Sequence, residues 1–174
     1  MINSARNYFK TNTVSSKYFQ TGFTLIELLI VMAIIGVLAS VIILFPIGSS
    51  KRARDARRES DLKQYQSSLE VYASRNVSGL YPSRTDVAGV PASTTLCSDL
   101  GLTNCSADPY YSQNNTYIYN YQSNGTTGTV TATQYILWGK MEAVTNYFVV
   151  CSNGKTGTVA QAGWVNPTNG SCPL

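Results

Sequence analysis

An uncharged run of twenty residues, Leu28 to Ile47, is the feature that most limits how this chain can fold. At a rise of about 1.5 Å per residue, a helix of that length spans roughly 30 Å, the thickness of the hydrocarbon core of a bilayer. The run therefore predicts a membrane-spanning helix. A carboxylate, Glu27, directly precedes it. Because an ionisable group inside a membrane costs on the order of 2.5–3.5 kcal/mol, this acid is predicted to have a specific role.

The residues around Glu27 form the string Gly-Phe-Thr-Leu-Ile-Glu, at positions 22–27. This string resembles the prepilin-peptidase site of type IV pilins and of the related pseudopilins of type II secretion. In that family a membrane peptidase cuts after the glycine and methylates the new amino-terminal residue, and the acid four positions later helps subunits to assemble. The resemblance implies that Gly22 precedes the cut, that Phe23 becomes the new terminus and that Glu27 is the assembly acid.

Two simpler interpretations compete for this amino-terminal segment. A secretory signal peptide also has a basic start and an apolar core, but its core is about 7–15 residues long and small residues follow it at the cut. Here the apolar run is longer, and Gly22 precedes it. A plain single-pass anchor fits the hydrophobicity equally well, but it leaves the acid and the string around it unexplained.

Four parts follow from this pattern. Residues 1–22 are polar and free of acids, and they are predicted to be a leader that is cleaved. Residues 23–48 are the predicted transmembrane and assembly helix, and residues 49–76 are its amphipathic continuation. Residues 77–174 are the predicted β-rich extracellular head.

The charges are placed on both sides of the apolar run. The net charge is +4, and the leader carries three of the basic residues with no acid. Basic residues before a span agree with a cytoplasmic leader. A second basic cluster follows the span: Lys51, Arg52, Arg54, Arg57 and Arg58. It is interpreted as a solvated face above the lipid headgroups or as contacts to acids of neighbouring subunits; the interspersed acids argue against a nucleic-acid patch.

Spacing within the helical part predicts how it packs. Small residues, Ala33, Gly36 and Ser40, share one helix face and would let two helices approach closely, although such residues are also simply common in membrane helices. Pro46 removes a backbone donor, so a kink is expected near residues 42–48. Further on, one apolar stripe predicts an amphipathic helix that lies on a core: Leu62, Tyr65, Leu69 and Tyr72.

After Gly79 and Pro82 the pattern changes from helix to strand. Residues 80–114 are loop-like, with one helical turn expected near 98–102. Alternation at residues 117–121 predicts a strand. Further strands are predicted at 129–133, 134–141, 147–151 and 156–160, the last pair joined by an Asn-Gly turn. The fold class is α+β: a long amino-terminal helix packed against a small antiparallel sheet, which is the layout of the pilin family.

All four cysteines lie beyond the apolar run: Cys97, Cys105, Cys151 and Cys172. This distribution suits an oxidising exterior. Four cysteines allow three pairings; we favour Cys97 with Cys105 and Cys151 with Cys172, because both loops are short. A zinc site is the competing interpretation, but the chain has no Cys-x-x-Cys pair and no histidine.

The absence of histidine removes the commonest general base, so catalysis is not expected, and neither a cofactor nor a metal is predicted. Major pseudopilins often bind calcium, which takes six to eight oxygen ligands. Asp108 is the nearest candidate here, and it has no carboxylate partner close in sequence. This favours a pilin over a secretion pseudopilin.

The predicted function is that of a type IV pilin-like subunit, inserted in the membrane, cleaved, methylated and polymerised into an extracellular filament for adhesion, motility or DNA uptake. The alternatives are a pseudopilin of type II secretion and a monomeric membrane-tethered surface-binding domain. Implied partners are prepilin peptidase, identical or related subunits, the inner-membrane assembly platform with its ATPase, and membrane lipid. Nucleic acid finds little support, because only four basic residues follow residue 64, against five acids. The subunit is expected to cross the membrane once, with its head outside the cytoplasm, before it joins a surface or periplasmic filament.

Overall fold

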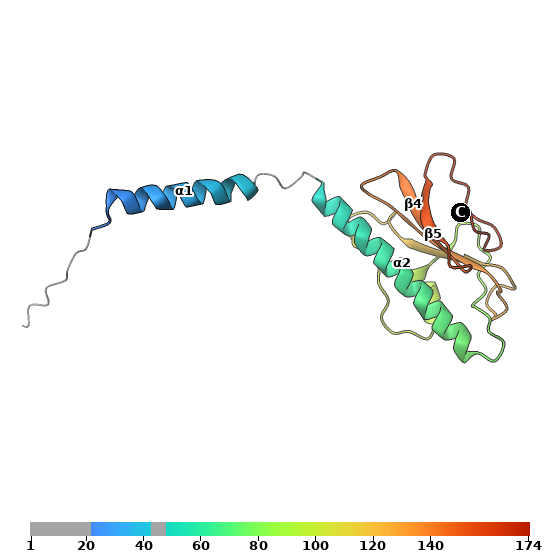
Figure 1. The fold of residues 1–174 in the computed structure, drawn as a ribbon. Coiled ribbons are helices and arrows are strands. Elements are labelled where there is room, and N and C mark those ends of the chain that lie inside the picture. Colours follow the sequence, from blue (N-terminus) through green and yellow to red (C-terminus); the bar gives the residue numbers. More distant parts are fainter. Residues whose placement is uncertain (1–21, 43–47) are drawn as a thin grey trace, which may run out of the picture. The chain divides into compact units, whose positions relative to one another are not determined.

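The computed structural model describes residues 22–42 and 48–174. They belong to two units of the chain, residues 1–45 and residues 46–174. The first unit contributes helix α1, Leu25–Ile42 (Figure 1). Most of the predicted leader and the predicted kink at Pro46 lie outside the described residues.

The second unit begins with helix α2, Ser49–Arg75. Gly48 precedes it with φ of +117°, a left-handed conformation that glycine adopts without a steric penalty. The predicted apolar stripe is buried along this helix: Leu62 and Leu69 are fully covered and Tyr65 is 4% exposed, while Tyr72 is partly exposed. The stripe therefore attaches α2 to the head, as its spacing predicted.

The head is a five-stranded antiparallel sheet in which neighbouring strands follow one another in sequence. The strands are β1 Val90–Pro91, β2 Tyr119–Ser123, β3 Tyr135–Lys140, β4 Asn146–Cys151 and β5 Thr156–Ala160. Helix α2 lies against the sheet (Figure 1). The predicted α+β fold class is confirmed.

Each face of the sheet has its own core. On the side of α2, the helix stripe packs with side chains of β2, β3 and β4, including Tyr121, Leu137 and Val150. Alternate residues of β3 and β4 form a second buried cluster with Trp138 and Cys151 among its members, and the carboxyl-terminal segment covers it with Trp164. Strands β3 and β4 are therefore apolar on both faces, as expected of strands that are buried on both sides.

One local prediction is wrong, and a second is right only in part. Residues 129–133 form no strand apart from an isolated bridge between Tyr81 and Ala132. Threonine hydroxyls bond to nearby backbone instead, since Thr129 Oγ1 donates to the carbonyl of Thr126 at 2.6 Å and Thr131 Oγ1 accepts from the amide of Thr126 at 3.0 Å. Such bonds compete with a strand ladder.

The helical turn expected near residues 98–102 is present, but it begins earlier in the chain than predicted. A π-helical turn, Ala92–Leu96, runs into the short helix α3, Cys97–Asp99, so the helical segment lies earlier in the chain. Ala92 and Leu96 are fully buried against the sheet. This burial explains the earlier start of the helical segment, because it covers apolar side chains that precede the predicted turn.

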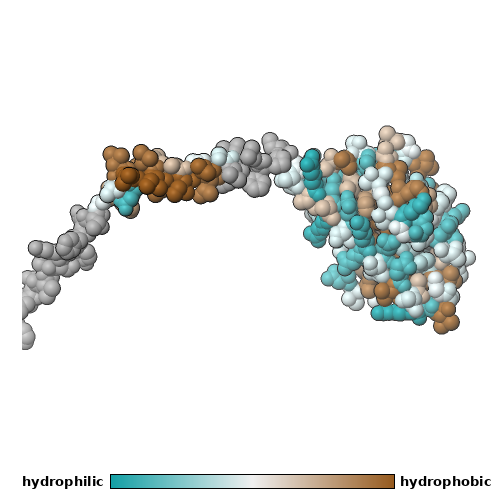
Figure 2. Space-filling model, in the orientation of Figure 1, coloured by the Kyte–Doolittle hydropathy of each residue, from teal (hydrophilic) through white to brown (hydrophobic). Residues whose placement is uncertain are grey.

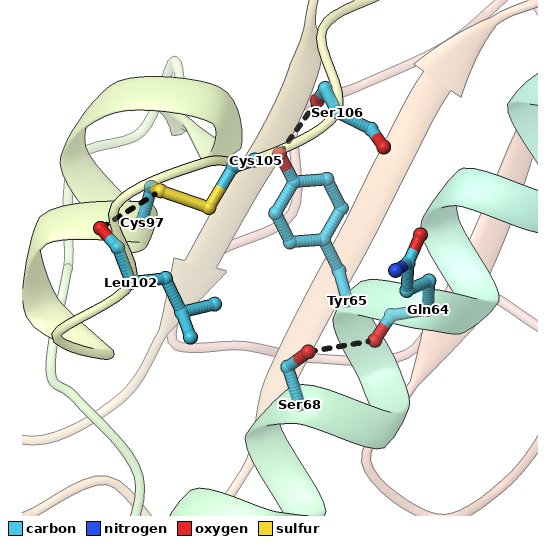
Figure 3. Close-up of a disulfide and its surroundings, with 7 residues drawn as sticks. All are labelled: Gln64, Tyr65, Ser68, Cys97, Leu102, Cys105 and Ser106. Carbon is cyan, nitrogen blue, oxygen red and sulfur yellow. Dashed lines mark hydrogen bonds between the residues drawn. A yellow bond between two sulfur atoms is a disulfide. The ribbon is translucent and has the colours of Figure 1, made fainter.

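Both predicted disulfides are present. Cys97 pairs with Cys105 across a Cα–Cα distance of 6.0 Å, and Cys151 pairs with Cys172 across 5.7 Å. Figure 3 shows the first of them beside α2, where Tyr65 donates a hydrogen bond of 2.6 Å from its hydroxyl to the carbonyl of Ser106. Ser106 directly follows Cys105, so the loop closed by this disulfide is also attached to α2. The zinc interpretation is wrong, because all four sulfurs are in disulfides.

Candidate functional site

The candidate processing and assembly site lies at the start of α1. Thr24 immediately precedes the helix, and its side chain and that of Glu27 are hydrogen-bonded to each other. The Glu27 carboxylate accepts from the Thr24 amide at 2.9 Å and from its hydroxyl at 2.7 Å. In return, the Thr24 hydroxyl accepts from the Glu27 amide at 3.3 Å. The two residues therefore close the first turn of the helix reciprocally.

This arrangement is a capping box, in which a threonine before the helix and an acid three residues later satisfy amides that have no partner within the helix. A negative charge in the first turn also interacts favourably with the helix dipole. Helix capping is thus a local role of Glu27, in addition to the assembly role predicted for it. The Thr-x-x-Glu spacing ahead of an apolar run was a sequence signal for it.

The predicted cleavage point is open to approach. Phe23 is 90% exposed, and a Cβ added to Gly22 would meet nothing within 4 Å. No neighbour among the described residues therefore requires glycine at this position. A requirement for glycine at position 22 would come from an enzyme that binds the segment.

Helix α1 exposes apolar side chains on all sides. Its large apolar residues with described side chains range from 50% exposed, at Ile30, to 83% exposed, at Leu25. Figure 2 shows brown, hydrophobic side chains along the visible face of this helix. A helix that is apolar all round is normally enclosed by protein or lipid.

Ala33, Gly36 and Ser40 are exposed on α1. A Cβ added to Gly36 would meet nothing within 4 Å, so this position is open for a close approach by another helix. The Ser40 hydroxyl donates to the carbonyl of Val37 at 2.7 Å and is therefore satisfied within its own helix.

The predicted span ends among residues 43–47, which are not described. Among the helices of the described residues, none combines the length and apolar character needed to cross a bilayer.

A charged cluster at the start of α2 organises the head. The Arg58 guanidinium is fully buried and donates to Asp108 from Nε at 2.7 Å and from Nη2 at 2.9 Å. Its Nη1 also donates to Asp55 at 2.6 Å. Asp55 in turn accepts from the backbone amides of Glu142 and Ala143, at 2.8 and 2.7 Å. The cluster thus joins α2, the loop at residue 108 and the connection between β3 and β4.

Ion pairs shift the pKa values in this cluster. Burial alone would lower the pKa of Arg58, but the hydrogen bonds to Asp108 and Asp55 raise it above its ordinary value. The hydrogen bond from Arg54 lowers the pKa of Glu142, against the opposing effect of burial. Both shifts favour the charged forms of Arg58 and Glu142, and the ion pairs of the cluster place opposite charges side by side.

This cluster changes two expectations. Arg54 and Arg58 were predicted to lie on a solvated face or between subunits. Instead they form ion pairs with Glu142 and Asp108 of the head. Asp108 is buried in the ion pair with Arg58, so its carboxylate is not free as the calcium ligand considered above. Within residues 22–42 and 48–174, no three histidine, cysteine or acidic side chains come together as a metal site.

Most of the tyrosines that the alternation singled out are structural. Tyr119 and Tyr121 are buried, and their hydroxyls donate to Asp61 and to the carbonyl of Pro82, at 2.8 and 2.7 Å. Burial raises the pKa of Tyr121, as it does that of Tyr119. These rings are enclosed in the head core, so they are not available for stacking on nucleic-acid bases.

Comparison with known proteins bears on this site directly. Residues 18–43 match the model of the prokaryotic N-terminal methylation motif. The matched range includes the proposed cut and the capping box.

Proteins named type II secretion system core protein G are among the relatives of this chain. The protein of Pectobacterium carotovorum subsp. carotovorum is 35% identical over 83 residues, which cover 48% of this chain and 52% of the relative. That of Vibrio cholerae serotype O1 is 33% identical over 36% of this chain and 42% of the relative. That of Escherichia coli K12 is 38% identical over 30% of this chain and 37% of the relative. The chain thus matches about half the length of these relatives or less, and they favour the secretion alternative over the pilin interpretation.

Proposed function

We propose that this chain, whose methylation motif and relatives support the type IV pilin and pseudopilin family, is a non-catalytic filament subunit of the pseudopilin type. In this proposal prepilin peptidase cuts after Gly22 and methylates Phe23. The subunit then waits in the inner membrane, with its head outside the cytoplasm. An assembly platform and its ATPase move it into a periplasmic filament that acts in protein secretion.

The observation that carries this proposal is the exposed apolar surface of α1. Burying one large aliphatic side chain is worth about 1.5–3 kcal/mol, so a helix that is apolar on every side gains strongly from being enclosed. Its large apolar side chains are at least half exposed within the described chain. Lipid before assembly and equivalent helices after assembly would both provide that enclosure.

Small residues on α1 support packing against equivalent helices. In lipid the hydrophobic effect does not drive helices together, so close contact depends on small residues. Ala33, Gly36 and Ser40 provide such a face, and it is uncovered in the described part of the chain.

The assignment to secretion depends on the relatives, because a pilin and a pseudopilin would have the same motif, helix and sheet. All three relatives described above are named as secretion core proteins. A pilin-type surface filament is the second candidate, since the string from Gly22 to Glu27 is common to both kinds of subunit.

The test is to delete the gene for this chain in its own host. Export of secreted enzymes and the number of surface pili are then measured, by activity in the medium and by electron microscopy. We expect export to fall while surface pili persist, and full-length wild type to restore export. Lost pili with unchanged export would assign the chain to a pilus instead, and no change in either would refute the filament role.

A further inference from the structure

The cations at the start of α2 are of two kinds, those paired with carboxylates and those that are exposed without such a partner among the described residues. Arg58 is buried among carboxylates, Arg54 is paired with Glu142, and Arg57 lies 3.8 Å from Asp61. Lys51 and Arg52 are exposed and form no ion pair within the described residues. Two cations at the beginning of this helix are therefore available to an external anion.

The position of these two cations in the chain indicates which kind of anion they would meet. The sequence from Leu28 to Ser50 carries no charge, so Lys51 and Arg52 are the first charges after the apolar run. If that run lies in a bilayer, as the proposed function requires, the two side chains come at the level of the headgroups. Basic residues at this level are attracted to anionic lipids, an effect that falls off within a Debye length.

A surface groove beside Arg52 supplies a second feature of such a site. Its volume is about 450 Å³, and its wall is partly apolar, with Ala56, Ala143 and Val144. Val144 is 49% exposed. A cation beside an apolar wall suits a ligand that has a phosphate next to hydrocarbon, which is the chemistry of a phospholipid.

Two acids also line this groove and would oppose an anion. The Asp55 carboxylate is already used by Arg58 and by two backbone amides. Glu59 forms no ion pair among the described residues, but it follows Arg52 by seven residues. At about 1.5 Å per residue it lies ~10 Å further along the helix, about one Debye length away from the cation.

We propose that Lys51 and Arg52 bind the phosphate of an anionic phospholipid, with the groove beside Arg52 accepting the adjoining apolar part of that lipid. This contact would hold the start of α2 at the membrane surface before assembly, and it rests on the membrane-anchored stage of the proposed function. Leaving the membrane then requires that the contact be broken.

The test uses the full chain in neutral detergent micelles, with phosphatidylglycerol or phosphatidylcholine added and bound lipids counted by native mass spectrometry. We expect wild type to bind phosphatidylglycerol more tightly, and less so at high salt. The variant Lys51→Gln/Arg52→Gln should lose about five-fold in affinity for each cation removed. The matched control is Arg75→Gln/Lys155→Gln, which removes two exposed cations, one at the end of α2 and one in the head, and should bind as wild type does.

Several outcomes would overturn the inference. Equal binding by wild type and by the double variant would do so, as would equal loss in the control. Displacement of the lipid by inorganic phosphate alone would indicate a site for free anions. Carbodiimide cross-linking of Lys51 to an acid of a second copy, without any lipid preference, would indicate a subunit contact.

Failure of the inference and failure of the proposed function are distinguishable. If wild type stays with membranes through carbonate extraction but shows no preference for phosphatidylglycerol, only the lipid contact is refuted. If carbonate releases the chain from cellular membranes, the membrane-anchored stage is refuted, and the lipid contact with it.

Discussion

The guanidinium of Arg58 and the carboxylate of Asp108 form a two-pronged ion pair between residues fifty positions apart, and both side chains are completely buried. One belongs to α2 and the other to a loop between α3 and β2. Charges enclosed in this way stabilise a fold only while each keeps its partner.

Replacing Arg58 by Met should therefore destabilise the head by about 3–5 kcal/mol, because the buried Asp108 loses its partner. The measurement is urea unfolding of the full chain in detergent, followed by the fluorescence of Trp138 and Trp164. Arg57→Met is the matched control, since the Arg57 side chain is 64% exposed and its pair with Asp61 is long. Similar losses in the two variants would contradict the role assigned to Arg58.

Acid should weaken the head partly through Glu142. Its pKa is lowered in the folded protein, chiefly by the hydrogen bond from Arg54, so its contribution to stability is fully present above the unfolded value of about 4.3. That contribution is lost as the pH falls below this value and through the folded pKa. We expect Glu142→Gln to lower the melting temperature at neutral pH and to differ less from wild type in strong acid. A constant difference at every pH would show that the charge of Glu142 is not responsible.

The two disulfides should differ in their contribution. They close loops with sequence separations of 8 and 21 residues. By chain entropy these are worth about 2.5 and about 3 kcal/mol. Replacing both members of a pair by Ser should therefore cost more at Cys151 and Cys172 than at Cys97 and Cys105. Urea unfolding of the two double variants decides the order, and a reversed order would mean that native-state contacts outweigh loop closure.

Processing is predicted to yield a protein that begins at Phe23 with a methylated amine. Intact mass and amino-terminal sequencing of the protein from its host check this. Gly22→Leu should abolish the cut, although the described chain leaves space for a side chain there. Ala33→Leu, which leaves the string intact, is the control for cleavage. A mature terminus beyond residue 40 would contradict the assignment.

The capping box allows the charge of Glu27 to be separated from its local role. Glutamine can take the place of the acid in a capping box, so Glu27→Gln should keep the helix start while removing the charge. We predict that this variant is inserted and cleaved but joins filaments poorly, because the new amine of a neighbouring subunit loses its anionic partner. Thr24→Ala weakens the cap and keeps the charge, so it should assemble better than Glu27→Gln. The opposite order in filament yield would assign Glu27 to helix capping.

Local signals predicted the parts of the fold that depend on neighbours in sequence. Strand β5 has the predicted limits, because Gly154, at φ of +81°, provides the turn that Asn153 and Gly154 indicated. Strand β1 was missed, because its two residues pair with Tyr121 and Asn120, about thirty positions away. The threonines at 129–133 misled the prediction, since hydroxyl groups that favour strands also bond to local backbone.

In the candidate site, too, features set by neighbours in sequence were predictable and features set by distant contacts were not. The string at 22–27 was recognisable as it stood, and the capping box within it was readable from spacing alone. The ion-pair partners of the basic cluster could not be predicted from spacing, because only the fold brings Asp108 and Glu142 to α2. Tertiary structure therefore determines that Lys51 and Arg52 form no ion pair within the described part of the chain.

The order of the strands has a consequence for how the head forms. From β2 to β5 each strand pairs with the next one in sequence, and α2 comes before them all. Contacts between segments close in sequence favour fast folding. A chain that emerges amino terminus first can thus add one hairpin after another to a helix that has already emerged. If the first segment is anchored in the membrane, as the proposed function requires, the head can fold while that segment is still in lipid.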